Sequence, residues 1–141
     1  MGDPRRLKKK YDVPSHPWEK DRIAEENRLI HEYGLKNKRE IWRARTTVRK
    51  YRKLAREMVG LSQEERAKDE AALMGKLTHM GIMNPEQTLD DVLSLDVSNI
   101  LERRLQTRVW KLGLARTAKQ ARQFITHGHI ALDDVRTTAP S

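Results

Sequence analysis

Cysteine is absent from this sequence of 141 residues. Without thiols the chain cannot form disulfides, use a cysteine nucleophile or offer sulfur ligands to zinc. Apolar residues are also scarce, since Leu, Ile, Val and Phe together fill only 30 positions. That share is close to the level below which chains stay disordered, so we expect a partner to order part of this chain.

Long apolar runs and catalytic motifs are missing too. No stretch approaches a membrane span, and the basic start of the chain lacks the apolar segment of a signal peptide. We therefore expect a cytoplasmic protein without membrane contact. The five histidines fit no metal-binding motif and no phosphate-binding glycine loop occurs, so we expect no enzyme, no cofactor and no metal. A small metal site at His127 and His129 is an alternative that we do not favour.

Positive charge is abundant and unevenly spread. The formal net charge is +9 and the isoelectric point is near 10.0. Counted by segment, the net charge is +9 for residues 1–60, −5 for residues 61–100 and +5 for residues 101–141. Two basic blocks thus flank an acidic one, which suits two RNA contact surfaces and one face turned to solvent or to protein.

The stretch from Leu101 to Ile130 has the pattern of helix, turn, helix, turn and strand. Its first helix is predicted from apolar residues spaced by four, four and three positions, and it ends at Gly113. The second helix is predicted to follow the capping residue Thr117, to run from Ala118 to His127 and to stop at Gly128, before a short strand. The apolar stripe of the first helix is Leu101, Leu105, Val109 and Leu112, that of the second is Ala118, Ala121 and Ile125, and the strand is His129–Leu132.

The outer face of this stretch is cationic, with no carboxylate between Arg103 and Leu132. A solvated basic face is the simpler interpretation of most charge runs, but the lack of interspersed acids favours an anionic polymer as ligand. The free N–H groups of a helix that starts after Thr117 also suit a phosphate. The predicted RNA contacts of this stretch are Arg104, Arg108, Arg116, Thr117, Lys119, Gln120, Arg122, Gln123, His127 and His129.

Several short runs together match a known family. They are Arg104-Leu105, Leu112–Thr117, Gln120–Ile125 and His127–Ile130, and, near the start of the chain, Met1–Arg6 and Trp18–Ile23. The first four resemble the RNA-binding module of the small-subunit ribosomal protein S-four family. The match near the start resembles the archaeal and eukaryotic branch of that family, and it is the part that points to the ribosome.

The resemblance implies a structural constituent of the small ribosomal subunit. Such a protein binds small-subunit ribosomal RNA directly and early in assembly, touches neighbouring small-subunit ribosomal proteins, and lies near the place where messenger RNA enters, where it affects decoding accuracy. No homo-oligomer is expected. Some family members bind zinc through cysteines near the N-terminus, a feature that cannot be carried over to a chain without cysteine.

The expected fold is mainly α: a basic extended arm (residues 1–17), a helical body (18–100) and an α+β helix-turn-helix-strand RNA-binding module (101–141). Prolines and a dense cluster of cations predict that the arm is extended and follows a phosphate backbone; a disordered tail or a targeting signal is the alternative. We expect Tyr11 and Trp18 to pack where the arm meets the body, with stacking on bases or ribose as the alternative. The predicted RNA contacts of the arm are Arg5, Arg6, Lys8, Lys9 and Lys10.

The body begins with a helix predicted to start at Ser15 or His16, with Pro17 in its first turn, and to stop at Gly34. The next helix, from Lys36 to Val59, repeats apolar residues every seven positions and should pack on another helix. A homodimeric coiled coil is a weaker interpretation, because the repeat is short and lacks flanking acids. The repeat consists of Ile41, Ala44, Val48, Tyr51, Ala55 and Met58, and the predicted RNA contacts are Arg43, Arg45, Arg49, Arg52 and Lys53.

The acidic block is predicted to form a helix that starts at a capping box at Ser62 and ends before Gly81. Acids repel RNA, so its acidic face should turn away from RNA. Thr88 starts a further short helix, and Asp96 caps the helix that leads into the module. The residues expected to face inward are Ala67, Ala71, Met74 and Leu77.

The last residues are expected to be an incomplete end of the module. Asp133-Asp134 suits a hairpin turn, but the returning strand has little apolar alternation. Family members usually carry Asn-Gly or Asp-Gly here, so Asp134 is a departure that weakens the turn. A DNA-binding regulator, another non-ribosomal RNA-binding protein and an RNA-modifying enzyme that carries the module are the alternatives for function.

Overall fold

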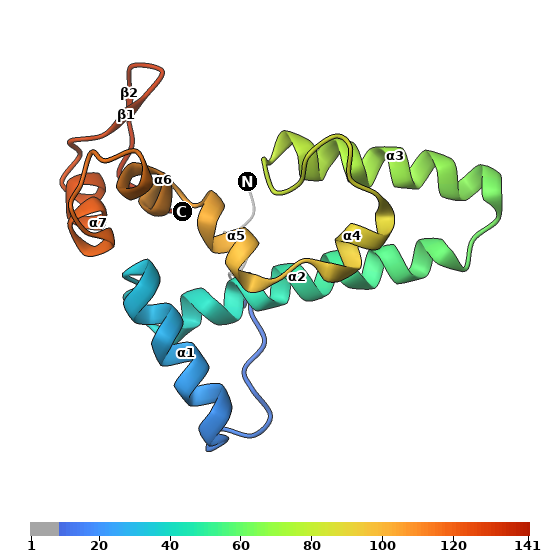
Figure 1. Ribbon diagram of the computed structural model, residues 1–141, viewed down its shortest axis with the longest axis horizontal. Helices are drawn as coiled ribbons and strands as arrows, with labels where there is room; N and C mark the ends of the chain where they lie inside the picture. Colours follow the sequence, from blue (N-terminus) through green and yellow to red (C-terminus); the bar gives the residue numbers. More distant parts are fainter. Residues whose placement is uncertain (1–8) are drawn as a thin grey trace, which may run out of the picture.

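The structure is a computed structural model that describes residues 9–141, so the predicted contacts Arg5, Arg6 and Lys8 and the run Met1–Arg6 lie outside the described residues. The described chain is mainly α, as predicted, with one small hairpin after the last helix (Figure 1). No helix within it is both long and apolar enough to cross a membrane. The elements are α1 Lys20–Tyr33, α2 Lys38–Val59, α3 Gln63–His79, α4 Leu89–Ser94, α5 Val97–Arg103, α6 Leu105–Lys111, α7 Ala118–Thr126, β1 Ala131–Leu132 and β2 Val135–Arg136.

Helix α2 is the longest element and extends across the molecule (Figure 1). At one end α3 doubles back along it, and α4 packs on α2 beside α3. At the other end α1, α5, α6, α7 and the hairpin gather, with α1 in contact with both α2 and α7. The predicted body and the predicted module therefore meet at the end of α2 that follows α1.

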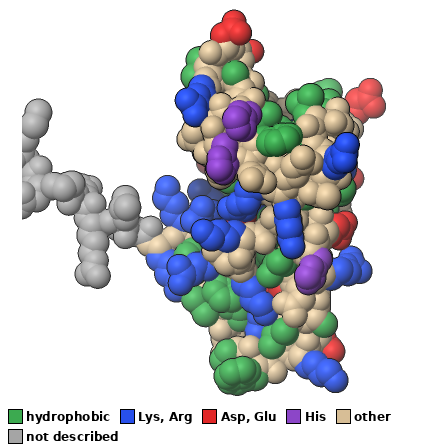
Figure 2. All heavy atoms as spheres, turned by 90° about the vertical axis from the view of Figure 1, so that its left-hand side faces the viewer, with side chains coloured by type: hydrophobic (Ala, Val, Ile, Leu, Met, Phe, Trp, Pro, Cys, Tyr) green, Lys and Arg blue, Asp and Glu red, His purple; other side chains and the backbone are tan. Residues whose placement is uncertain are grey.

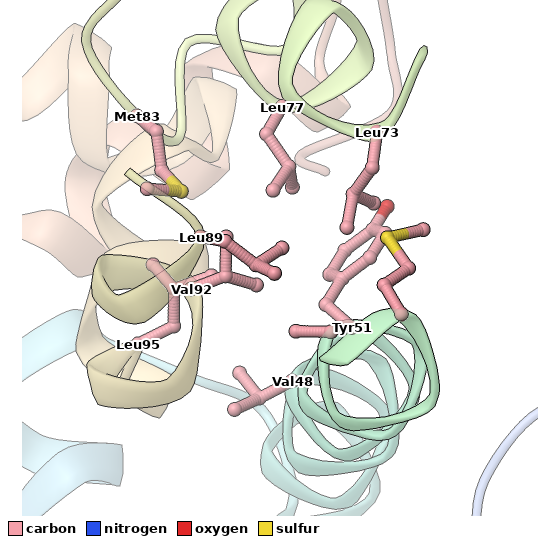
Figure 3. Close-up of a cluster of buried hydrophobic side chains, with 10 residues drawn as sticks. Val48, Tyr51, Leu73, Leu77, Met83, Leu89, Val92 and Leu95 are labelled. Atoms are coloured by element: carbon pink, nitrogen blue, oxygen red, sulfur yellow. The ribbon is translucent and has the colours of Figure 1, made fainter. Parts of the chain in front are cut away.

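The seven-residue repeat of α2 is buried over its whole length, as predicted. Its second half packs against α3 and α4, with Tyr51 and Val48 facing Leu77 and Val92 (Figure 3). Its first half, beginning at Ile41, packs against α1 and α5 instead. All six repeat positions thus serve contacts within one chain, and full burial of each large side chain is worth about 1.5–3 kcal/mol.

The start of α1 differs from the prediction. The helix begins at Lys20 and not at Ser15 or His16, so Pro17 precedes it. The backbone carbonyls of His16 and Pro17 accept hydrogen bonds from the Arg22 guanidinium, both at 2.9 Å, and residues 17–18 form a turn. The end of the helix is as predicted, with Gly34 in the left-handed conformation at φ 60°.

Helix α3 confirms its predicted end but not its predicted inner face. Leu77 is buried and Met74 is half-buried, whereas Ala67 and Ala71 are exposed and Leu73 is buried in their place. The first half of α3 lies beside only the far end of α2 (Figure 1), whereas Leu73 and Leu77 of the second half join the core formed with α2 and α4. The Ser62 hydroxyl bonds the Glu65 carboxylate at 2.9 Å and caps no backbone amide, so the expected capping box does not form.

The predicted first helix of the module is broken at Arg104 into α5 and α6. At the break Thr107 turns inward, and its hydroxyl donates to the carbonyl of Leu101 at 2.7 Å. Leu101 therefore belongs to the core around α1 and α2, whereas Val109 belongs to the core of the module. Leu112, the last residue of the predicted stripe, is 68% exposed.

The rest of the module follows the prediction closely. Gly113 and Gly128 are left-handed, Thr117 accepts a hydrogen bond from the Gln120 amide at 3.1 Å, and α7 buries its predicted apolar stripe. The helix ends at Thr126, one residue early, and the strand begins at Ala131, two residues after the predicted start. Asp133 and Asp134 do form the turn of an antiparallel hairpin, each with positive φ.

Candidate nucleic-acid interface

The module is fixed to the body by a buried amide. Gln106 of α6 is 1% exposed, and its Nε2 donates to the carbonyls of Tyr33, Gly34 and Ala118 at 3.1, 2.9 and 2.9 Å. One side chain therefore bonds the end of α1 and the start of α7. Gly34 allows this approach, because a Cβ built there would lie 2.9 Å from the backbone of Ala118.

An ion-pair network adjoins this amide. Glu40, in the first turn of α2, accepts a bidentate pair of hydrogen bonds from Arg122 of α7 at 3.0 and 3.1 Å, and it lies 2.8 Å from Arg104. Arg122 also donates to the Gln106 side chain at 3.2 Å. We call Glu40, Arg104, Gln106 and Arg122 the polar joint, since together they connect α2, α6 and α7.

The polar joint lowers the pKa of Glu40. Burial by itself raises the pKa of this carboxyl, but hydrogen bonds from Arg122 and Arg104 and their positive charges outweigh burial. The carboxylate is thus ionised at neutral pH and neutralises part of the charge of two arginines that the sequence suggested as RNA contacts.

A second carboxylate, which is fully buried, connects α1 to the first part of α2. Glu26 is 0% exposed and accepts hydrogen bonds from Arg22 at 2.8 Å and from the Trp42 indole at 3.0 Å, with Lys38 at 3.4 Å and Arg45 at 3.9 Å. Burial raises the pKa of Glu26, and these hydrogen bonds and cations bring it below its ordinary value. The predicted RNA contact Arg45 therefore has an internal anionic partner.

Six of the predicted cationic contacts are engaged within the chain. Arg52 is half-buried and donates to the Leu95 carbonyl. Arg45 and Arg52 each follow a buried repeat residue by four positions, which places them beside the packed seam of α2. The engaged set is Arg45, Arg49 (with Asp12), Arg52, Lys53 (with Glu57), Arg104 and Arg122.

The other predicted cations within residues 9–141 are exposed and form no ion pair with an acid of that range. This set is Lys9, Lys10, Arg43, Arg108, Arg116 and Lys119. Figure 2 shows the side of the molecule that carries α1 and α7, where Lys and Arg side chains gather in the middle and Asp and Glu lie at the margins. Such an excess of one sign raises the local concentration of anions.

The predicted polar contacts lie on the module beside these cations. Thr117 caps α7, and the half-buried Gln120 accepts a hydrogen bond from the Arg116 amide at 2.8 Å. Gln123 is exposed. His127 and His129 are exposed and stacked at 6.3 Å, and no group of three metal-ligating side chains occurs in the described chain.

The prediction omitted several exposed cations of α2 and the loop before it. Four of them form no ion pair with an acid in the described range: Lys36, Arg39, Lys50 and Arg56. The seven-residue repeat contains the signal that finds three of them, because Arg39, Lys50 and Arg56 occupy helical positions outside the buried seam. No pattern in the sequence predicts the polar joint, because its residues are distant from one another along the chain.

A long helical body joined through buried polar groups to a small helix-helix-hairpin unit defines a two-part protein whose second part is an S4 domain. The sequence model of the S4 domain matches residues 103–141, and that of the ribosomal protein S4/S9 N-terminal domain matches residues 2–102. The chain belongs to the family of small ribosomal subunit protein uS4.

Relatives from archaea share about half of their residues with this chain. Small ribosomal subunit protein uS4 of Methanothermobacter thermautotrophicus is 54% identical over 140 residues, covering 99% of this chain and 82% of the relative. The protein of the same name from Ignicoccus hospitalis is 54% identical, covering 99% and 84%. That from Saccharolobus solfataricus is 52% identical over 141 residues, covering 99% and 78%.

Proposed function

We propose that this chain is a structural constituent of the small ribosomal subunit and binds small-subunit ribosomal RNA directly. The observation that carries the proposal is the set of exposed cations on α2 and on the module, on either side of the polar joint. The family and the names of the archaeal relatives support the same conclusion. The role is structural and not enzymatic.

The geometry supports a clamp on folded RNA. Cations such as Arg43 and Lys50 lie on α2, whereas Arg116 and Lys119 lie at the start of α7, and the polar joint holds these two surfaces at a fixed angle. Each surface would neutralise phosphates of a different RNA helix. The angle between the surfaces would then select the shape of the RNA, with base sequence contributing little.

The surfaces outside these two basic ones would contact protein and RNA neighbours in the cytoplasmic ribosome. The exposed acids Glu64, Glu65 and Asp69 on α3 repel phosphates and would face neighbouring small-subunit ribosomal proteins. We also propose that the chain binds early during assembly, lies near the place where messenger RNA enters and affects decoding accuracy. The chain would act as a single copy, because its seven-residue repeat is used internally.

A salt titration tests direct binding. The full chain is titrated against small-subunit ribosomal RNA and against duplex DNA at several salt concentrations. A steep decrease of log affinity with log salt is expected for the RNA, since each phosphate contact contributes a slope of about −0.7 to −0.9 in model nucleic acids. A slope near zero, or equal affinity for duplex DNA, would contradict the proposal.

A matched pair of lysines locates the binding surface. Lys119→Ala on α7 should weaken RNA binding and make the salt slope shallower by about one contact. Lys68→Ala on the acidic helix α3 is the control, since this exposed lysine is surrounded in sequence by acids and should leave affinity unchanged. Equal effects of the two variants would remove the module from the interface.

A further inference from the structure

Trp18 is the most exposed large hydrophobic residue of the described chain, at 90%. The sequence suggested that Tyr11 and Trp18 pack where the arm meets the body. Tyr11 does so, with its ring 6.1 Å from that of Trp42. Trp18 does not, and an indole left almost wholly in water is unusual, because tryptophan is on average well buried.

The backbone that carries this indole is held in place by side-chain hydrogen bonds. The Arg22 guanidinium donates to the carbonyls of His16 and Pro17 at 2.9 Å each and forms a salt bridge with the buried Glu26 at 2.8 Å. The turn before α1 is thus bonded to a carboxylate inside the protein. Little backbone entropy is lost when a ligand meets a side chain presented in this way.

The surroundings of Trp18 favour a flat aromatic ligand. Its neighbours in sequence, His16, Pro17, Glu19 and Lys20, are all exposed, and apart from Trp18 itself the only exposed large hydrophobic residue in residues 9–20 is Val13. A protein contact centred on tryptophan usually has apolar neighbours that exclude water from it. A single exposed ring among polar groups instead resembles the aromatic platforms on which unpaired bases stack.

We propose that Trp18 is a stacking site for one unpaired base of the bound RNA. The proposal rests on the proposed function, since it names a base contact within the same complex. It adds a contact that does not depend on phosphate charge and lies at the opposite end of α1 from the polar joint (Figure 1).

Two variants of similar hydrophobicity test the stacking. Trp18→Phe retains an aromatic face, whereas Trp18→Leu has none. In the full chain, Trp18→Leu should weaken binding of small-subunit ribosomal RNA about 5- to 150-fold, the range expected for loss of one stacked base, and Trp18→Phe should retain most of the affinity. Val13→Ala, at the other exposed hydrophobic residue of this segment, is the control and should bind normally.

Two further readouts separate stacking from other effects. The salt slope of Trp18→Leu should equal that of the wild type, because stacking releases no counterions. Chemical probing of the RNA should show one unpaired nucleotide that wild type and Trp18→Phe protect and that Trp18→Leu leaves reactive. Melting temperatures should be unchanged, since the ring is exposed; a large decrease would show that Trp18 packs on the protein and would overturn the proposal.

The remaining outcomes are also decisive. Equal affinity of all variants overturns the stacking site, and so does an equal loss in Trp18→Phe and Trp18→Leu. Normal RNA affinity combined with failure of Trp18→Leu to join ribosomal particles would assign the ring to a protein partner instead. Failure of the wild type itself to bind ribosomal RNA would reject the proposed function and leave no base to stack.

Discussion

At the scale of single residues, the buried Glu26 and the partly buried Glu40 hold several arginines within the fold. Glu40 engages Arg104 and Arg122, and Glu26 engages Arg22 and Arg45. In the folded protein, each of these arginines contacts a carboxylate where water would otherwise solvate it. We therefore expect these arginines to fix the positions of helices, and exposed residues such as Lys119 to contact phosphates.

Glu40→Gln should destabilise the protein by about 1–2 kcal/mol at neutral pH, because two partly buried arginines lose their anionic partner. The effect should decrease in acid. The folded-state pKa of Glu40 is lowered, so its carboxylate stabilises the fold above its ordinary pKa, and this stabilisation is lost as pH falls through the folded-state value. Thermal unfolding followed by circular dichroism from pH 7 to pH 3 would measure this.

In that experiment the wild-type melting temperature should decrease more between neutral and acid pH than that of Glu40→Gln. The variant keeps some acid sensitivity, since the pKa values of Glu26 and Asp96 are lowered too. Parallel pH curves for the two proteins would show that Glu40 contributes nothing to stability through its charge.

At the scale of elements, the contact between α1 and α7 depends on a glycine. Gly34→Ala should destabilise the protein by about 3 kcal/mol or more, because the alanine must adopt positive φ and its Cβ meets the backbone of Ala118 at 2.9 Å. Gly81→Ala is the matched control: Gly81 has φ 66° but no atom within 4 Å of the added Cβ, so it should lose only about 1 kcal/mol. Urea unfolding compares them, and equal losses would exclude the steric contribution.

The hairpin contains a turn that one substitution should improve. Asp133 and Asp134 have φ of 48° and 64°, and a two-residue turn with both φ positive favours glycine at its second position. Asp134→Gly should raise the protection of hairpin amides from hydrogen exchange, with a gain of about 0.5–1 kcal/mol in local stability. Asp12→Gly, outside the hairpin, is the control, and unchanged protection in Asp134→Gly would show that the turn is not strained.

The sequence predicted the features that depend on the pattern of residues close to one another along the chain. The seam of α2, the Thr117 cap of α7 and the glycine stops all follow from periodicity and local backbone preference. The break at Arg104 and the late start of α1 were missed. The Gln106 backbone amide donates to the Pro140 carbonyl instead of a helical one, and the side chains of Thr107 and Arg22 bond the carbonyls of Leu101 and His16. The candidate cations were predicted as a group, but their division into engaged and exposed members depends on pairs such as Glu40 and Arg122, 82 positions apart.

At the scale of the whole molecule, we expect the polar joint to couple folding to RNA recognition. Because the sequence predicted Arg122 as an RNA contact, Arg122→Glu is the direct test of that prediction. In the structure this change would place a new carboxylate beside Glu40, so the variant should lose both stability and affinity. Lys119→Glu, on the exposed face of the same helix, should lose affinity while its melting temperature stays near that of the wild type.

A charge exchange separates the two roles of Arg122. Combining Arg122→Glu with Glu40→Arg restores an ion pair between α2 and α7, although Arg104 then lacks its partner, so stability should return in part. If Arg122 acts by fixing the angle between two basic surfaces, affinity for ribosomal RNA should recover together with the melting temperature. Recovery of the melting temperature without recovery of affinity would instead mean that the Arg122 guanidinium contacts RNA, and that the angle between α2 and the module matters less than local charge.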